Sequence, residues 1–461
     1  MNCYLFVDFG STNTKVTLVD IEKEDIIGTA KAYTTVETDV MTGYNNALEL
    51  LHKKTGTDYT VVKSLACSSA AGGLKIIAIG LVPELTSEAA KRAALGAGAK
   101  VIHTYSHNLN KSEAEAIVNS NADIILLAGG TNGGDSRCIL HNAKMLADYG
   151  VRVPVVVAGN KSAEDEIIEI FKDKVEFHLA ENVMPKINKL NVESARETIR
   201  SIFMNNIVHA KGMTHVESNI DNILMPTPAA VLKAAQTLSE GTENEAGLGD
   251  LVVLDIGGAT TDVHSAAEGD PTQGSVFLYG LPEAFLKRTV EGDLGMRYSL
   301  TAMADEMNME VFADELGIEQ SKIEDWIKRC VAAPATLPQT DEEARIEQGL
   351  ARNAVKVAVE RHCGYFEPAF TPMGQVFTLT GKDLSDVPYI VGIGGSIKNN
   401  TDPKQILSGA EKKASRDPMF AKPKAPKYML DKKYIFASMG LLSTFEPHLA
   451  LAIMKKEITE I

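Results

Sequence analysis

The amino-acid sequence predicts an α/β protein with two similar halves and an extra α/β region inserted into the first half. The halves are predicted by two stretches that share one pattern, "YLFVDFGSTNTKVTLVD" at residues 4–20 and "LVVLDIGGATTDVHS" at residues 251–265. In each, an apolar strand ends in Asp-x-Gly, small and hydroxyl residues follow, and a β pattern resumes. The insertion is predicted by apolar strands that alternate with helices, which is typical of a parallel sheet covered on both faces.

Length and composition narrow the class of protein. The 461 residues are too many for one compact core, so we expect two or more domains. A net charge of −15 argues against nucleic acid as a general partner, because phosphate binding needs basic patches. The start lacks the pattern of a signal peptide, and no apolar run reaches the roughly 18 residues of a membrane-spanning helix. We therefore expect a cytoplasmic protein that does not bind or span a membrane. The five cysteines are scattered without a C-x-x-C, so we expect no disulfide framework, zinc site or iron–sulfur site.

The first half is expected to begin with an antiparallel meander of strands at 3–8, 14–20 and 26–33. A helix at 41–56 and a buried strand that runs into the small-residue loop "CSSAAGG" complete this first domain part, residues 1–72. The inserted α/β region is placed at 73–200. Connecting helices are expected at 201–245, one of them with Thr227 as its N-cap, and the second domain at 246–461. A C-terminal helix is expected to return to the first domain.

The second half is expected to repeat the meander from residue 251 and to be largely helical from about 281 to 365. Near its end a buried strand enters the loop Gly392-Ile393-Gly394-Gly395-Ser396. Glycines at a strand-to-helix turn permit close contact with the face of an adenine or ribose. Such a loop is also a frequent ordinary turn, so alone it does not establish a nucleotide site.

Each Asp-x-Gly turn has the chemistry of a polyphosphate site. The N–H groups of a tight turn form an anion nest, glycine lets the backbone approach, and hydroxyls add donors. An aspartate at the end of the strand can hold Mg²⁺ through water. A single turn of this kind is better explained by an ordinary hairpin, whereas the pair favours function. The first turn offers Asp8, Gly10, Ser11, Thr12, Asn13 and Lys15, and the second offers Asp255, Gly257, Gly258, Ala259, Thr260 and Thr261.

The two turns and the glycine loop, in this order, resemble the actin-like ATPase superfamily, which includes sugar kinases, actin and the heat-shock chaperone ATPases. The resemblance implies two ribonuclease H-like domains around a nucleotide cleft. A narrower resemblance covers essentially the whole chain: "FVDFGSTNTK", "DIILLAGGTNGGD", "DIGGATTDVHS" and "TVEGDLGMRYS" are similar to the glutamate mutase L family (MutL/GlmL). That family is encoded beside adenosylcobalamin-dependent mutases. It implies an ATP-dependent switch that is a reactivating chaperone or accessory factor for glutamate (methylaspartate) mutase.

The resemblance also implies roles for residues at matching positions. Asp8 and Asp255 would flank Mg²⁺, held through water, and the attacking water, which makes them the expected catalytic residues. The other residues of the two turns would grip the phosphates of ATP. The implied partners are the subunits of the mutase, and the oligomeric state stays open, a homodimer included. The chaperones' separate catalytic lysine has no matching position. The residues expected at the adenosine are Gly392, Gly394, Gly395 and Ser396.

Two further motifs have more than one explanation. In "EGDLGMR", Glu291 or Asp293 could face the nucleotide and Arg297 a phosphate, whereas Asp293 also suits the N-cap of a following helix. In "AGGTNGGD", Gly129 and Gly130 precede a helix and suit either an anion site or an ordinary loop. Three alternative functions stay open: a metabolite kinase, an activator that reduces a partner through an iron–sulfur cluster, and a nucleotide-binding scaffold without turnover. The lack of paired cysteines weighs against the activator.

Overall fold

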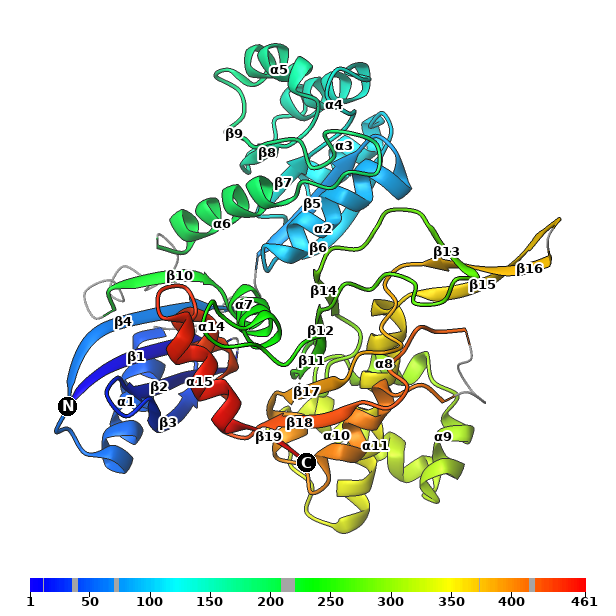
Figure 1. Cartoon of the computed structure of the whole chain (residues 1–461). Helices are drawn as coiled ribbons and strands as arrows, with labels where there is room; N and C mark the ends of the chain where they lie inside the picture. Colours follow the sequence, from blue (N-terminus) through cyan, green and yellow to red (C-terminus); the bar gives the residue numbers. More distant parts are fainter. Residues whose placement is uncertain (11, 35–39, 70–73, 209–219, 373, 414–418) are drawn as a thin grey trace. The chain divides into compact units, whose positions relative to one another are not determined.

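The computed structural model of the chain describes residues 1–461 except 11, 35–39, 70–73, 209–219, 373 and 414–418 (Figure 1). Its contacts divide the chain into two compact units. Unit 1 comprises Met1–Ala234 and Ala437–Ile453, and unit 2 comprises Ala235–Phe436 and Met454–Ile461. The chain first passes from unit 1 to unit 2 inside helix α7 (Thr227–Glu240), within the segment expected to connect the domains.

Unit 1 contains a five-stranded sheet in the order β10-β4-β1-β2-β3. β1, β2 and β3 form the predicted antiparallel meander, β4 is parallel to β1, and β10 is parallel to β4. Helix α1 (Val40–Thr55) packs on β2 and β3, and its residues Met41, Tyr44, Ala47 and Leu51 join the core formed by the sheet. The strands are β1 (Asn2–Phe9), β2 (Asn13–Asp20), β3 (Asp25–Tyr33), β4 (Thr60–Ser68) and β10 (Asn222–Pro226).

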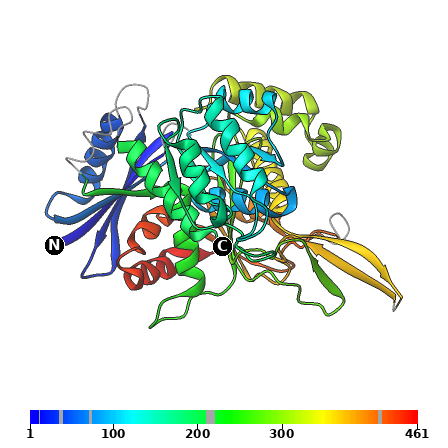
Figure 2. The same cartoon turned by 90° about the horizontal axis from the view of Figure 1, so that it is seen from above.

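The inserted region of unit 1 is a five-stranded sheet in the order β6-β5-β7-β8-β9, and all its pairs are parallel, as predicted (Figures 1 and 2). Its central strands are almost wholly apolar and buried, because helices cover a parallel sheet on both faces. The strands are β5 (Lys75–Gly80), β6 (Lys100–Ser106), β7 (Ile124–Leu127), β8 (Val155–Val157) and β9 (Phe177–Leu179). The helices are η2 (Pro83–Ser87), α2 (Glu88–Gly96), α3 (Lys111–Val118), α4 (Arg137–Asp148), η3 (Lys161–Ala163), α5 (Glu164–Phe171) and α6 (Glu193–Val208).

Unit 2 repeats the first sheet and adds one strand, in the order β14-β12-β11-β17-β18-β19. β11, β12 and β14 form an antiparallel meander, while β17 is parallel to β11 and β18 to β17. Each unit thus contains a meander followed by parallel strands on the other side of its first strand, and the predicted α/β fold class is confirmed. The strands are β11 (Leu251–Ile256), β12 (Thr261–Ala266), β14 (Leu286–Glu291), β17 (Tyr389–Ile393), β18 (Lys427–Asp431) and β19 (Ile458–Glu460).

The helices of unit 2 lie mainly between β14 and β17. The expectation of a largely helical stretch from 281 was wrong at its start, because 286–291 is strand β14. Its sequence "LKRTVE" carries two cations on a half-buried strand, so the apolar alternation of a strand is weak. The helices are α8 (Leu300–Asp305), α9 (Met309–Leu316), α10 (Gln320–Ala332), α11 (Asp341–His362), α12 (Gly395–Lys398), α13 (Pro403–Leu407) and η5 (Ser408–Ala410).

Two smaller groups complete the chain. A three-stranded sheet of unit 2 has the order β13-β16-β15, from β13 (Val276–Tyr279), β15 (Tyr365–Thr371) and β16 (Gly374–Thr380). Near the C-terminus lie α14 (Phe436–Leu442) and α15 (Pro447–Glu457). Gly440 of α14 touches α7, since a Cβ there would lie 1.8 Å from the carbonyl oxygen of Ala230. Every helix in the described part of the chain is too short or too polar to cross a membrane.

Candidate functional site

The first turn joins β1 to β2 and contains an ion pair. Asp8 and Lys15 face each other in the register of the hairpin, and Lys15 Nζ lies 3.0 Å from Asp8 Oδ2. The N–H of Gly10 donates to the carbonyl oxygen of Asn13 over 3.2 Å and closes the turn. A Cβ at Gly10 would lie 2.7 Å from that oxygen, so the turn requires glycine. The ammonium of Lys15 is therefore engaged by Asp8.

The second oxygen of Asp8 is held from two other elements. Thr227, the first residue of α7, donates its hydroxyl to Asp8 Oδ1 over 2.6 Å. Cys67 of β4 lies beside it, with Sγ 3.6 Å from the same oxygen. Burial, and secondarily the charge of Asp8, raises the pKa of the Cys67 thiol well above its usual range. Asp8 is thus a buried carboxylate fixed by three side chains from three different elements.

The contacts of Thr227 and Cys67 with Asp8 were not predicted from the sequence. Thr227 was expected to be an N-cap, but the helix begins at Thr227 itself and its hydroxyl donates to Asp8. Cys67 begins the small-residue stretch "CSSAAGG", which by itself suggests no contact with Asp8. The contacts follow from the parallel pairing of β1, β4 and β10. Because the three strands end side by side, Cys67 of β4 is paired with Asp8 of β1 and with Met225 of β10.

The second turn joins β11 to β12 and is closed in the same way. The N–H of Gly257 donates to the carbonyl oxygen of Thr260 over 2.9 Å. Asp255 faces Asp262 in the register, where the first hairpin has Asp8 opposite a lysine. Arg288 of β14 neutralises Asp262, because its Nε and Nη2 lie 2.8 Å and 2.6 Å from Asp262 Oδ1. The second turn thus takes its cation from the third strand of the meander.

A following segment, residues 295–299, binds the carbonyl groups of the second turn. The amide of Arg297 donates to the carbonyl oxygen of Gly258 over 2.8 Å, and the hydroxyl of Ser299 donates to that of Ala259 over 2.8 Å. Gly295 allows this approach, since a Cβ there would lie 2.3 Å from the carbonyl carbon of Ala259. Within the described residues, no group accepts a hydrogen bond from the amides of Gly258 and Ala259. These two amides are therefore free to bind an anion.

The predicted phosphate residues differ in accessibility. Thr12 and Ala259 are exposed, and Asn13, Gly258 and Thr260 are half-buried. Ser11 lies outside the described residues, so its place in the first turn stays a prediction. Thr261 is fully buried and donates its hydroxyl to the carbonyl oxygen of Leu294 over 2.6 Å, which makes its observed role structural.

The predicted adenosine loop follows β17, and it touches the second aspartate. Gly394 has φ 94°, and a Cβ there would lie 2.7 Å from Asp255 Oδ1. Glycine is therefore required both by the backbone conformation and by the carboxylate behind it. Gly392 is buried, and a Cβ there would lie 3.0 Å from Leu407, so it packs against a helix. Gly395 and Ser396, at the start of α12, are the accessible members of the loop.

The two acids of "EGDLGMR" converge on one arginine of α11. Arg361 Nη1 lies 2.8 Å from Glu291 Oε2 and 2.8 Å from Asp293 Oδ1. A third carboxylate, Glu306, lies 3.0 Å from Arg361 Nη2. The hydrogen bond to Asp293, together with the weaker effect of that to Glu291, raises the pKa of Arg361. Both acids expected near the nucleotide are therefore engaged with a cation of the protein itself.

Asp293 does not stand at the start of a helix. The amide of Leu294 approaches the carbonyl oxygen of Glu291 at 3.5 Å, so the segment after β14 is a turn. The next helix, α8, begins only at Leu300, and Ser299 is in its cap position. The N-cap alternative for Asp293 was therefore wrong, because several residues separate it from the first turn of α8.

Arg297 gives its hydrogen bonds to the protein. Its Nη1 lies 2.7 Å from Glu347 Oε1, and its Nε and Nη2 donate to the carbonyl oxygens of Pro334 and Thr336, each over 3.1 Å. Glu347 also accepts from Trp326 Nε1 over 3.2 Å. The guanidinium expected to reach a phosphate is therefore engaged between α11 and the loop before it.

The loop "AGGTNGGD" has its own internal partners in the inserted region. Gly129 and Gly130 have φ 145° and 70°, and the carbonyl oxygen of Gly130 accepts from Asn182 Nδ2 over 2.9 Å. Asp135 Oδ2 accepts from the amide of Cys138 over 3.1 Å, so the chain's own carboxylate occupies the start of α4. These contacts describe an ordered structural loop, and the predicted anion site there stays a prediction.

Comparison with known proteins identifies the family. A family model described as MutL protein matches residues 4–458. Protein MutL of Clostridium tetanomorphum is 52% identical over 463 residues, which cover 100% of both chains.

Two solved structures are remotely similar. Nucleotide-free acetone carboxylase has a TM-score of 0.42 and 13% identity, over 95% of this chain and 69% of that chain. Glycerol dehydratase reactivase has a TM-score of 0.34 and 10% identity, over 96% of this chain and 99% of that chain. The family model and the full-length relative agree with the motifs, and the chain belongs to the MutL protein family, the glutamate mutase L family.

Proposed function

We propose that this chain is a cytoplasmic, ATP- and Mg²⁺-dependent switch that reactivates an adenosylcobalamin-dependent glutamate mutase by acting on its subunits. The family and its name support the partner. The observation that carries the nucleotide chemistry is the repeated closure of the two Asp-x-Gly turns. Gly10 donates to Asn13 over 3.2 Å and Gly257 donates to Thr260 over 2.9 Å, once in each unit.

The turns have the donors that phosphate oxygens need. The amides of Gly258 and Ala259 lack protein acceptors within the described residues, and the hydroxyl of exposed Thr12 adds a donor at the first turn. We propose that Gly395 and Ser396 contact the adenosine. A phosphate would compete with Asp8 for the ammonium of Lys15, so nucleotide binding would weaken their ion pair.

The carboxylate of Asp8 suits Mg²⁺ only if water molecules lie between its oxygens and the ion. Both oxygens of Asp8 already accept from side chains, and Mg²⁺ usually keeps several of its waters. When bound, Mg²⁺ offsets phosphate charge and helps to position the attacking water. Asp8 and Asp255 would hold waters of that shell, and one of the two would help to orient the water that attacks the γ-phosphate.

The switch needs a link from the turn to the rest of the chain, and α7 offers one. Thr227 binds Asp8 at the start of this helix, and residues 235–240 of the same helix belong to unit 2. We propose that loss of the γ-phosphate changes the contacts of Asp8 and, through Thr227, those of α7. A ligand can shift conformations only through such a difference in contacts between states.

The test is ATP hydrolysis by the purified chain, alone and with oxygen-inactivated, cobalamin-loaded glutamate mutase, while recovery of mutase activity is followed. We expect the mutase to stimulate hydrolysis and to recover activity. Asp8→Asn and Asp255→Asn should each abolish both effects, whereas Asp325→Asn, an exposed carboxylate of α10, should not.

The outcomes separate the alternatives. Tight ATP binding without hydrolysis or recovery would favour the scaffold. ADP release that depends on a small acceptor instead of the mutase would favour the metabolite kinase. Full activity of both aspartate variants would refute the proposed site.

A further inference from the structure

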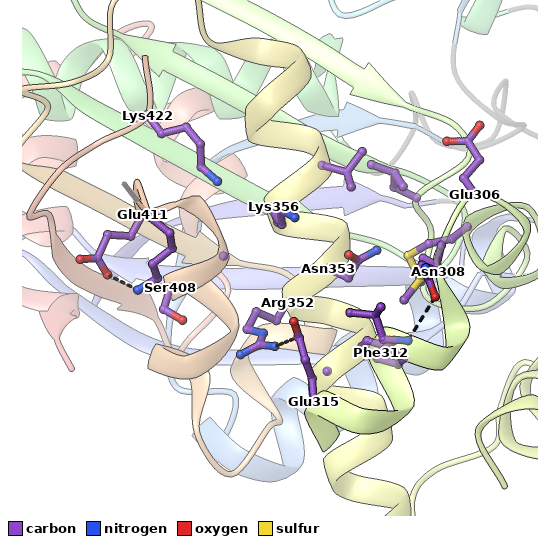
Figure 3. Close-up of a pocket in the computed structure, with 18 residues that line it drawn as sticks. Glu306, Asn308, Phe312, Glu315, Arg352, Asn353, Lys356, Ser408, Glu411 and Lys422 are labelled. Atoms are coloured by element: carbon purple, nitrogen blue, oxygen red, sulfur yellow. Dashed lines mark hydrogen bonds and ion pairs between the residues drawn. The ribbon is translucent and has the colours of Figure 1, made fainter. Parts of the chain in front are cut away.

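Unit 2 contains a pocket that is separate from both turns and from the glycine loop. It lies between α8 and α9, the middle of α11, residues 408–413 and Lys422 (Figure 3). Its volume is about 350 Å³, which is within the roughly 300–1,000 Å³ of small-molecule sites. None of its lining residues belongs to the predicted nucleotide site.

The floor of the pocket is apolar. Leu294, Met303 and Phe312 are buried members of the main core of unit 2, and Met307 and Val357 pack against that core. Their side chains would contact a hydrocarbon group without loss of any hydrogen bond. Burial of apolar area against such a floor is the main source of affinity for a small ligand.

The acids that line the pocket already have partners. Arg352 Nη2 lies 3.1 Å from Glu315 Oε2 across the pocket wall (Figure 3). Glu306 is 3.0 Å from the guanidinium of Arg361, which also binds the two acids of the preceding turn. The third acid, Glu411, accepts a hydrogen bond of 2.9 Å from the hydroxyl of a tyrosine of β18.

Two of the lining lysines are paired as well. Lys413 Nζ lies 3.4 Å from Glu411 Oε2, and Lys422 Nζ lies 3.4 Å from Glu360 Oε1. Among the lining residues that the structure describes, these contacts and the arginine pairs leave no carboxylate to neutralise a further lysine.

That further lysine is Lys356. Lys356 and Asn353 are three residues apart on α11, so they share one face of the helix, and both line the pocket (Figure 3). Within the described residues, neither side chain has a hydrogen-bond or ion-pair partner. Among the described groups of the pocket, the ammonium of Lys356 and the amide of Asn353 therefore lie without protein partners beside an apolar floor.

We propose that this pocket binds a small monocarboxylate with an apolar body. The carboxylate would bind Lys356 and Asn353, and the hydrocarbon would lie on the floor. A single unpaired cation matches a single negative charge. Inorganic phosphate has no apolar body to lie on the floor, and one ammonium does not neutralise a dianion, so phosphate should bind poorly.

The experiment is calorimetric titration of the full chain, without nucleotide, with sodium hexanoate. We expect saturable binding, and binding of the neutral hexanamide and of inorganic phosphate at least about tenfold weaker. Lys356→Met and Asn353→Leu should each weaken hexanoate binding at least about tenfold, whereas Lys356→Arg should retain it. The matched control is Lys328→Met, an exposed lysine of α10 outside the pocket, which should leave binding unchanged.

Three results would overturn the proposal: no binding of hexanoate to the wild type, equal binding to Lys356→Met, or tighter binding of phosphate. If Lys356→Met does not fold, Asn353→Asp provides the same test, because its added charge should repel the carboxylate. The titration contains no ATP and no mutase, so its outcome is independent of the proposed switch.

Discussion

The hydroxyl of Thr227 donates a hydrogen bond of 2.6 Å to Asp8, a residue 219 positions earlier in the chain. This bond connects the end of β1 with the first residue of α7. Asp8 is only 3% exposed, so it cannot exchange this donor freely for water. The aspartate of the first turn and the start of the helix should therefore respond together to substitution.

Replacement of Thr227 by valine tests this connection. The variant keeps the shape of the side chain but leaves Asp8 Oδ1 with only the weak thiol donor of Cys67. We expect the free energy of unfolding of unit 1 to fall by about 1–3 kcal/mol, the cost of an unsatisfied buried acceptor, in urea titrations. Thr227→Ser restores a hydroxyl and should recover most of the loss. Equal stability of the valine variant and the wild type would contradict the connection.

Arg288 should be essential for the second hairpin. Its side chain is 4% exposed and that of Asp262 is 13% exposed, so removal of the arginine leaves a largely buried carboxylate without its cation. We expect Arg288→Leu to lower the free energy of unfolding by about 3 kcal/mol in denaturant titrations. Asp262→Asn together with Arg288→Leu should be less destabilised than Arg288→Leu alone. A double variant that is less stable than the single variant would refute the pairing.

Arg297 should affect stability more than nucleotide affinity. Arg297→Met keeps the aliphatic stem but removes the cation from buried Glu347, so we expect a loss of about 3 kcal/mol in thermal or urea unfolding. The dissociation constant for ATP, measured well below the melting temperature, should change by less than about threefold. A large loss of ATP affinity with little loss of stability would instead support the phosphate contact expected from the sequence.

Asp431 should make the stability of unit 2 depend on pH. Burial raises its pKa from 3.8 to about 6, its Oδ2 accepts from the amide of Phe436 over 2.9 Å, and its Oδ1 has no partner among the described groups. Because the folded pKa exceeds the unfolded one, the protonated acid favours folding, and this contribution is lost as pH rises from about 4 to 6.

The matching variant is Asp431→Asn, which can still accept from the amide of Phe436 and carries no charge. We expect its stability relative to the wild type to rise by about 2–3 kcal/mol between pH 4 and 7. Asp325→Asn, an exposed site, should show no such trend. Parallel pH profiles of Asp431→Asn and the wild type would show that burial does not raise this pKa.

Local pattern was sufficient to predict much of the fold. The alternation of apolar residues located β1, β2 and β3, and the alternation of strands with helices located the parallel sheet of the insertion. β14 was missed because Lys287 and Arg288 interrupt its apolar pattern, and their partners Glu283 and Asp262 lie outside the strand. The ion-pair partner of a buried cation cannot be predicted from the sequence of the strand that carries the cation.

The candidate site was predictable in position but not in contacts. Asp8 and Asp255 follow from the repeated motif, whereas the convergence of Thr227 and Cys67 on Asp8 depends on strand pairing between distant segments. Arg297 shows the opposite case. It stands in a motif that suggests a phosphate contact, but tertiary structure gives its donors to a buried glutamate of α11 and to two carbonyl groups.

The burial of the cysteines has a consequence for the chemical durability of the chain. All five are free and buried, and burial raises the pKa of the thiol of each, to about 11 for Cys138 and Cys330 and about 12 for Cys363. Oxidants and alkylating reagents react with the thiolate, so these sulfurs should react slowly. A cysteine introduced on the surface would then be the preferred site for a single spectroscopic label, and the nucleotide cycle could be followed in air without removal of the native thiols.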